Sequence, residues 1–228
     1  MNPRFAAVLF DLDGTLVDSF ADIAASANHA LAALGRTPHP AATIKGWVGE
    51  GIQVLMQRAL DARDPELIAR AVAAWRPHYE AHCLDQTRPY EGIVPMLERL
   101  RGAGLPLGVV SNKLERLTRL ALEGLALASF FDVVVGGDTT SARKPDPTPL
   151  RFAAEKLGLS RGRLLFAGDT ANDLDAARAA GWTSCAVLWG QCDEAALRLH
   201  CPDHIVAHPR EIVALALGPR DAGVVKRG

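Results

Sequence analysis

Residues 6–19 read AAVLFDLDGTLVDS, and this stretch decides the fold. The apolar run at residues 6–10 has the length and composition of a strand that is buried on both faces. That strand ends at Asp11, and a second carboxylate follows at Asp13, directly before Gly14. Two carboxylates so close together repel each other unless a cation lies between them, and glycine lets the backbone turn sharply beside a ligand. The stretch therefore indicates a Mg²⁺ site at the tip of a buried strand.

Length, charge and composition limit the possible functions. The chain has 228 residues, enough for one large domain or a domain with an insertion. Its formal net charge of −1 argues against a nucleic-acid partner. No apolar stretch approaches the roughly 18–20 residues of a membrane span, so we expect no membrane partner. The N-terminus leads directly into the first strand and leaves no room for a signal peptide, so we expect a cytoplasmic protein, with its four cysteines reduced.

The order of the predicted elements gives the fold class. Helical spacing of apolar residues runs from residue 19 to about residue 85, with Ser19 as a candidate N-cap, and we predict no strand between residues 19 and 90. From residue 90 onward, helices and strands alternate, which is typical of a parallel sheet. We therefore predict an α/β fold, a doubly wound parallel (Rossmann-like) sheet with an inserted helical cap domain. The predicted parts are a core of residues 1–16 and 88–218, a cap of residues 17–87 and a flexible tail at 219–228.

Within the core, each predicted strand and helix has its own segment. The predicted strands after the first are 105–110, 131–135, 164–167, 183–188 and 203–206, and the predicted helices are 93–103, 114–127, 147–157, 171–180 and 210–217.

Three histidines near the C-terminus, His200, His204 and His208, recur every four residues, which on a helix would suit a transition metal. Pro202 interrupts such a helix, and the segment 203–206 is predicted to be a strand instead. We therefore interpret these histidines as structural.

Polar residues follow four of the predicted strands. They are Asp11 and Asp13, the Ser-Asn-Lys run at 111–113, Lys144, and the pair Asp169 and Asp173. In an open α/β sheet, ligands bind at the carboxyl ends of the strands, where these residues would meet. Two groups of carboxylates, a hydroxyl and a lysine suit a phosphate ester bridged to Mg²⁺.

The same residues resemble the motifs of the haloacid dehalogenase superfamily, in its branch of phosphatases with a helical cap. The motifs stand in order as DLDGT at 11–15, SNK at 111–113, KP at 144–145 and GDTAND at 168–173. Within this superfamily the chain is most similar to phosphoglycolate phosphatases, because of the segments GWVGEG at 46–51, RAL at 58–60 and GGDT at 136–139.

The resemblance implies a role for each motif residue. Asp11 would be the nucleophile that forms an aspartyl-phosphate, and Asp13 the general acid and base for the leaving alkoxide and the attacking water. Dehalogenases of the superfamily lack a carboxylate at this second position, so Asp13 favours phosphate chemistry. The remaining implied roles are charge neutralisation by Lys144, substrate binding by Thr15, Ser111 and Asn112, and Mg²⁺ binding by Asp11, the backbone carbonyl of Asp13 and Asp169, with Asp173 supporting that metal shell.

The cap is expected to select the leaving group. Only five lysines occur beside twenty arginines, and Lys45 directly precedes the glycine-rich cap segment. We hypothesise that Lys45 contacts the leaving group when the cap closes, with Arg58 as a second candidate and an ordinary solvated lysine as the alternative. Glu50 departs from the pattern of the similar phosphatases, which often carry an uncharged residue there, and a carboxylate at this place would disfavour an anionic leaving group.

The sequence thus predicts a Mg²⁺-dependent phosphomonoesterase that acts on a small phosphorylated metabolite, foremost 2-phosphoglycolate, as a monomer or homodimer. One alternative is a phosphosugar phosphatase or mutase of the same superfamily. Such mutases resemble this chain less in the cap, where no matching arginine stands near Gly49. The other alternative is a binding module without catalysis, which would have no chemical need for Asp13 or Lys144.

Overall fold

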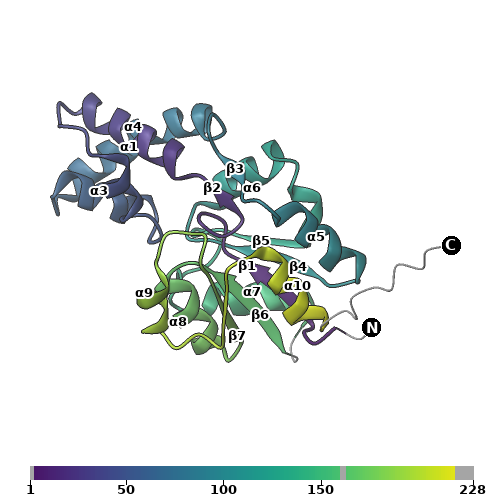
Figure 1. The fold of residues 1–228 in the computed structure, drawn as a ribbon. Coiled ribbons are helices and arrows are strands. Elements are labelled where there is room, and N and C mark those ends of the chain that lie inside the picture. The colour runs from purple at the N-terminus through teal and green to yellow at the C-terminus, as the bar shows by residue number, and fades with distance from the viewer. Residues whose placement is uncertain (1–2, 160–162, 219–228) are drawn as a thin grey trace.

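The structure, a computed structural model, describes residues 3–159 and 163–218 (Figure 1). The flexible tail predicted at residues 219–228 lies outside the described residues. No helix in the described part of the chain combines the length and the apolar character needed to cross a membrane.

The core is built on a parallel sheet, which confirms the predicted fold class. Within the described residues this sheet has six strands in the order β5-β4-β1-β6-β7-β8. The first strand lies inside the sheet, where its residue Phe10 pairs with Val109 on one side and Ala167 on the other. The strands are β1 (Ala7–Phe10), β4 (Leu107–Val110), β5 (Val133–Val135), β6 (Leu164–Gly168), β7 (Thr183–Val187) and β8 (His204–Val206).

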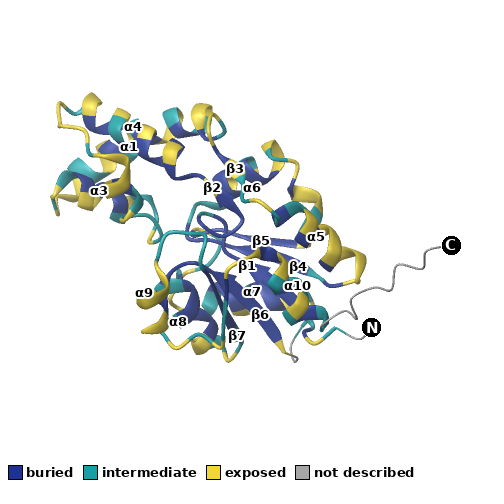
Figure 2. Ribbon diagram, in the orientation of Figure 1, coloured by how far each residue is buried: buried dark blue, intermediate teal, exposed yellow. Residues whose placement is uncertain are grey.

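Helices cover both faces of the sheet, because successive side chains of a strand point to opposite faces. Val8 and Phe10 of β1 pack toward α5 and α10, whereas Ala7 and Leu9 pack toward α7 and α8. Figure 2 shows the strands buried and the outer helix faces exposed. The core helices are α5 (Ile93–Gly102), α6 (Glu115–Gly124), the 3-10 turn η1 (Ala128–Phe130), α7 (Thr148–Lys156), α8 (Ala171–Ala180), α9 (Glu194–Arg198) and α10 (Pro209–Leu217).

The cap is a group of helices that pack around Ile44, Met56 and Trp75, in an apolar cluster that also includes Leu117 of core helix α6. It lies above the carboxyl ends of the sheet strands (Figure 1). Its helices are α1 (Phe20–Ala33), α2 (Ala41–Lys45), α3 (Ile52–Leu60) and α4 (Pro65–His82).

The two chain crossings between core and cap form a small ribbon. The strands β2 (Val17–Asp18) and β3 (Arg88–Pro89) pair antiparallel, so the prediction of no strand between residues 19 and 90 was wrong at its last residues. Beside the ribbon, the buried carboxylate of Asp22 accepts hydrogen bonds from the backbone N–H of Gln86 and from both the N–H and the hydroxyl of Thr87. These bonds lie where the chain leaves the core and where it returns to it. We therefore keep residues 17 and 87 as the proposed boundaries of the cap.

Three further details differ from the sequence prediction or test it. The short helix α9 was not predicted, because five residues give too little periodicity to recognise. Ser19 does stand at the N-cap position of α1, but its side chain makes no capping bond. The strand β8 confirms that the segment around His204 is not a metal-binding helix face.

Candidate active site

The four predicted groups of polar residues meet at one edge of the sheet. Asp11 and Asp13 follow β1, the run at 111–113 follows β4, Lys144 lies in the loop between β5 and α7, and Asp169 closes β6. This convergence follows from the parallel arrangement, because every strand ends at the same edge.

Three buried carboxylates form a cluster that suits a metal ion. Asp11, Asp169 and Asp173 each offer an oxygen, and these oxygens all lie within 4.8 Å of one another. Burial raises the pKa of Asp11 to about 6, and burial together with Asp173 and Asp11 holds the pKa of Asp169 well above its usual range. Carboxylates that resist ionisation for these reasons need a cation to become charged, and oxygen ligands are those that Mg²⁺ prefers. The residues therefore fit the expected Mg²⁺.

Lys144 connects the predicted nucleophile to this cluster. Its buried Nζ lies 2.8 Å from Asp11 Oδ1 and 2.7 Å from Asp173 Oδ1, and it donates a hydrogen bond of 2.7 Å to the carbonyl of Val110. Burial alone would lower the pKa of Lys144, but the two carboxylates outweigh it and raise the pKa. The ammonium therefore stays charged beside Asp11, where a phosphoryl group would bring further negative charge.

Asn112 holds Lys144 in place. Its Oδ1 accepts the backbone N–H of Lys144 at 3.0 Å, and its Nδ2 donates to the carbonyl of Lys144 at 2.9 Å. The same Nδ2 lies 2.8 Å from the carbonyl of Gly49 in the cap. The amide predicted to bind substrate is thus occupied by the protein itself, and this position fixes the loop that carries Lys144.

Asp13 has surroundings of its own, although only one residue separates it from Asp11. Lys113 Nζ lies 2.5 Å from Asp13 Oδ1, and the Ser19 hydroxyl donates to the same oxygen at 2.5 Å. Lys113 also donates to the hydroxyl of Tyr79, on cap helix α4, at 2.8 Å. Burial alone would lower the pKa of Lys113, but Asp13 and the phenol of Tyr79 outweigh it and raise the pKa. Asp13 is therefore held by a charged lysine that touches core and cap together.

The two predicted phosphate-binding hydroxyls lie on either side of Asp11 and Asp13. Thr15 Oγ1 donates to Asp169 Oδ1 at 3.0 Å, so this hydroxyl supports the metal cluster. Ser111 Oγ accepts the backbone N–H of Lys113 at 3.3 Å and lines a cavity together with both aspartates. Their contacts with a phosphoryl group remain predictions.

Two glycines leave room for Asp169. A Cβ added at Gly14, where φ is +87°, would lie 2.1 Å from Asp169 Oδ2, and one at Gly190 would lie 2.3 Å from Asp169 Cβ. Any larger side chain would displace a carboxylate of the cluster. The role of Gly14 was predicted from the sequence, whereas Gly190 comes close only through the fold.

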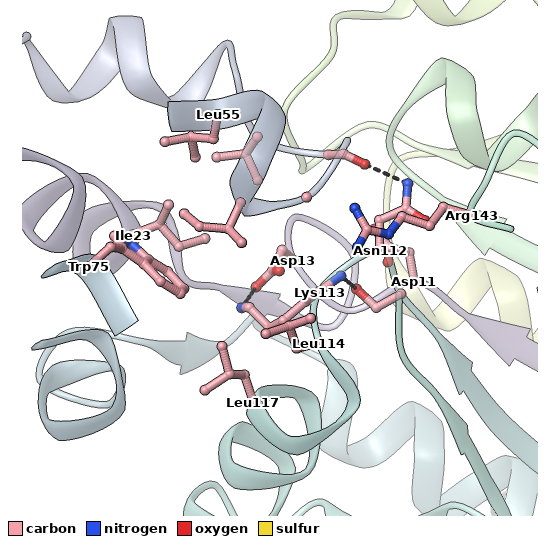
Figure 3. A pocket seen from close by; sticks show the side chains of 15 residues that line it. Asp11, Asp13, Ile23, Leu55, Trp75, Asn112, Lys113, Leu114, Leu117 and Arg143 are labelled. Atoms are coloured by element: carbon pink, nitrogen blue, oxygen red, sulfur yellow. Dashed lines mark hydrogen bonds and ion pairs between the residues drawn. The ribbon is translucent and has the colours of Figure 1, made fainter. Parts of the chain in front are cut away.

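A cavity opens between the cap and these catalytic groups (Figure 3). The core supplies its polar end. Cap residues and α6 supply an apolar end. The polar residues are Asp11, Asp13, Ser111, Asn112, Lys113 and Arg143, and the apolar side chains are Ile23, Val48, Ile52, Leu55, Trp75, Leu114 and Leu117.

The charged cap residues singled out in the sequence do not line this cavity. Lys45 Nζ donates to the carbonyl of Gly190 at 3.3 Å and lies 4.5 Å from the centre of the Phe20 ring. Arg58 forms an ion pair with Glu50, and both side chains are more than a third exposed. The charge of Glu50, which was expected to disfavour an anionic leaving group, is thus compensated at the surface.

Comparison with known proteins places the chain among similar hydrolases. The model of the haloacid dehalogenase-like hydrolases matches residues 8–187. The chain is 41% identical over 192 residues to a phosphoglycolate phosphatase of Neisseria gonorrhoeae, covering 82% of this chain and 81% of that protein. A phosphoglycolate phosphatase of Aquifex aeolicus is 37% identical over 91% of this chain and 95% of its own. The crystal structure of a predicted phosphoglycolate phosphatase from Haemophilus somnus superimposes with a TM-score of 0.86 at 28% identity, over 93% of this chain and 98% of that one.

A buried carboxylate cluster with a lysine, at the strand ends of a parallel sheet, defines a hydrolase site. The chain belongs to the haloacid dehalogenase-like hydrolase family. Its activity is that of a phosphoric monoester hydrolase, as the family and the named relatives indicate.

Proposed function

We propose that this protein hydrolyses 2-phosphoglycolate with Mg²⁺, through an aspartyl-phosphate formed on Asp11. The observation that carries the proposal is the different bonding of two aspartates at one strand end. Asp11 lies in the carboxylate cluster against Lys144, whereas Asp13 is paired with Lys113, and both line the same cavity. Asp11 is thus placed to attack the phosphorus atom, and Asp13 to transfer a proton. The curated relatives named as phosphoglycolate phosphatases support this choice of substrate.

In the first half-reaction a carboxylate oxygen of Asp11 forms a bond to phosphorus while the ester P–O bond breaks. The electron pair of that bond leaves with the alkoxide, which takes a proton from Asp13. Lys144 offsets the repulsion between the Asp11 carboxylate and the phosphate.

In the second half-reaction water attacks the aspartyl-phosphate while Asp13, now deprotonated, takes its proton. The P–O bond to Asp11 breaks, inorganic phosphate leaves, and the Asp11 carboxylate is restored. When bound, Mg²⁺ supplies positive charge that lowers the repulsion between the phosphoryl oxygens and the carboxylates. Asp11 and Asp169 are the side chains that would hold it, and Asp173, whose oxygens accept hydrogen bonds from Lys144 and Thr170, would support them.

The test is phosphate release from a panel of phosphorylated metabolites in the presence of Mg²⁺. We expect 2-phosphoglycolate to give the highest kcat/KM, with glycolate and inorganic phosphate as the only products. A clear preference for a sugar phosphate would contradict the substrate assignment, and isomer formation without phosphate release would identify a mutase instead.

A further inference from the structure

The cavity beside the catalytic aspartates raises the question of what binds the carboxylate of the leaving group. A carboxylate taken out of water costs free energy unless a cation or several hydrogen bonds receive it. Among the described residues that line the cavity, the cationic side chains are Lys113 and Arg143. The choice between them can be made from their contacts.

Lys113 is already engaged. Its ammonium pairs with Asp13, donates to the Tyr79 hydroxyl and lies 5.0 Å from the centre of the Tyr79 ring. Its side chain is only 7% exposed. A leaving-group carboxylate at this place would compete with Asp13 for the ammonium and would lie beside a second negative charge.

One nitrogen of the Arg143 guanidinium is hydrogen-bonded to the protein, and the other two are bonded to no residue that the structure describes. Its Nε donates to the carbonyl of Gly137 at 2.7 Å, which fixes the plane of the guanidinium. Across the described ranges 3–159 and 163–218, no ion pair or hydrogen bond engages Nη1 or Nη2. Figure 3 shows the guanidinium beside Asn112, directed toward the cavity. Toward the described part of the chain, the donors of Arg143 Nη1 and Nη2 are therefore all unused, whereas Lys113 already uses two of its three donors.

Gly51 of the cap lies close to Nη1 of Arg143. A Cβ at Gly51, where φ is +89°, would lie only 3.0 Å from Arg143 Nη1. Helix α3 begins at this glycine, and no side chain caps its first turn. A carboxylate in the adjoining cavity would therefore meet the guanidinium from the core and the positive end of a helix from the cap.

We propose that Arg143 binds the carboxylate of the leaving group and thereby selects 2-phosphoglycolate over phosphomonoesters with neutral alcohols. This inference rests on the proposed function. It assigns selectivity to a core residue next to Lys144, in place of the cap residues Lys45 and Arg58. A guanidinium receives a carboxylate through two parallel hydrogen bonds, a geometry that an ammonium cannot supply.

The experiment compares two substrates that differ only in this group. 2-Phosphoglycolate carries the carboxylate, and 2-hydroxyethyl phosphate carries a neutral hydroxymethyl group in its place. For Arg143→Gln we expect kcat/KM with 2-phosphoglycolate to fall about 10–100-fold, mainly through KM, because charge-assisted hydrogen bonds are lost. With 2-hydroxyethyl phosphate we expect a change of less than about threefold, since no such bond exists to lose. Arg143→Lys keeps the charge without the paired donors, so its loss is expected to be intermediate.

The matched control is Arg198→Gln, which removes the same charge from an exposed ion pair with Glu194 and should change the kinetics with neither substrate. Product inhibition by glycolate is the second measurement, and we expect it to weaken in both Arg143 variants while inhibition by inorganic phosphate stays the same.

The outcomes separate this inference from the proposed function. Equal losses for both substrates in Arg143→Gln would mean that the guanidinium binds the phosphoryl group, and unchanged kinetics would mean that it binds neither; each result overturns the inference alone. A wild-type enzyme that hydrolyses 2-hydroxyethyl phosphate but not 2-phosphoglycolate would overturn the proposed function and this inference with it.

Discussion

The two walls of the active-site cavity differ in kind. The core wall is polar, and its charged groups are mostly buried and bonded to each other, as in the pairs of Lys144 with Asp11 and of Lys113 with Asp13. The cap wall is formed by apolar side chains, while its charged pair of Arg58 and Glu50 faces solvent.

The two walls therefore have different roles in the reaction. Groups at the ends of sheet strands have fixed positions, which a reaction at phosphorus requires. The cap excludes water and limits the shape of the leaving group, and apolar side chains are sufficient for that task. If the division is correct, changes on the core wall should affect the chemistry strongly, and changes in the cap should affect stability or selectivity.

The largest effect should come from Asp11. The variant Asp11→Asn removes the nucleophile and one of the three clustered carboxylates, so we expect kcat to fall by at least about 10⁴-fold, as for other covalent nucleophiles. The measurement is Mg²⁺-dependent phosphate release, and trapping of a phosphorylated protein should succeed only with the wild type. Glu123→Gln, the same change at an exposed position, is the control. Retention of more than a tenth of the activity would contradict the role of Asp11.

A smaller effect, but one on both stability and activity, should follow from Lys113→Met. Removing one partner of a buried ion pair costs about 3–5 kcal/mol of stability, because the Asp13 charge is left uncompensated. We expect both a lower Tm and a lower kcat, measured by thermal unfolding and by phosphate release.

Two further variants separate the contributions around Lys113. Tyr79→Phe removes the hydroxyl but keeps the ring stacked on Trp75, so its cost should be about 1 kcal/mol. Lys156→Met removes an exposed lysine and should change little. If Lys113→Met lowered Tm without affecting kcat, Lys113 would join cap and core without influencing Asp13.

Stabilisation by Mg²⁺ should depend on pH. Because the pKa of Asp11, about 6, and that of Asp169 are raised in the fold, the metal-free protein holds more protons than the unfolded chain and loses stability as pH rises from about 4 to 6. Mg²⁺ replaces those protons, so it should raise Tm clearly at pH ~7.5 and little at pH ~5. At a concentration of 100 times its Kd the gain would be about 2.7 kcal/mol. An equal Tm gain at both values would show that these carboxylates do not bind the ion.

The smallest effect should come from a histidine cluster in the cap. Burial, with His29 and His82 nearby, lowers the pKa of His78, whose ring is stacked on that of His29. A lowered pKa means that the unfolded chain binds the proton better, so stability is lost as pH falls below about 6.5.

In His78→Gln the loss of Tm between pH ~7 and pH ~5 should become slightly smaller, whereas His208→Gln at an exposed position should leave this loss unchanged. An identical pH profile in His78→Gln and the wild type would contradict the effect.

Most of the catalytic residues on the core wall could be predicted from the sequence. Asp11, Asp13 and Asp169 lie at the ends of apolar runs, Lys144 lies in the loop after another such run, and parallel strands necessarily bring their carboxyl ends to one edge. Local patterns were therefore enough to predict the fold class and to place these residues in one site. They were not enough for the ribbon of β2 and β3 or for α9, which are too short for a periodic signal.

Only the tertiary structure determined the contacts between segments that are far apart in the chain. No local pattern predicts that Lys113 reaches Tyr79, that Gly190 makes room for Asp169, or that Arg143 is open toward the cavity while Arg58 pairs with Glu50 at the surface. The physical reason is that an isolated charge has no assigned partner in a sequence. Its partner is determined by how the cap lies on the core, and that arrangement sets which cation a leaving group meets.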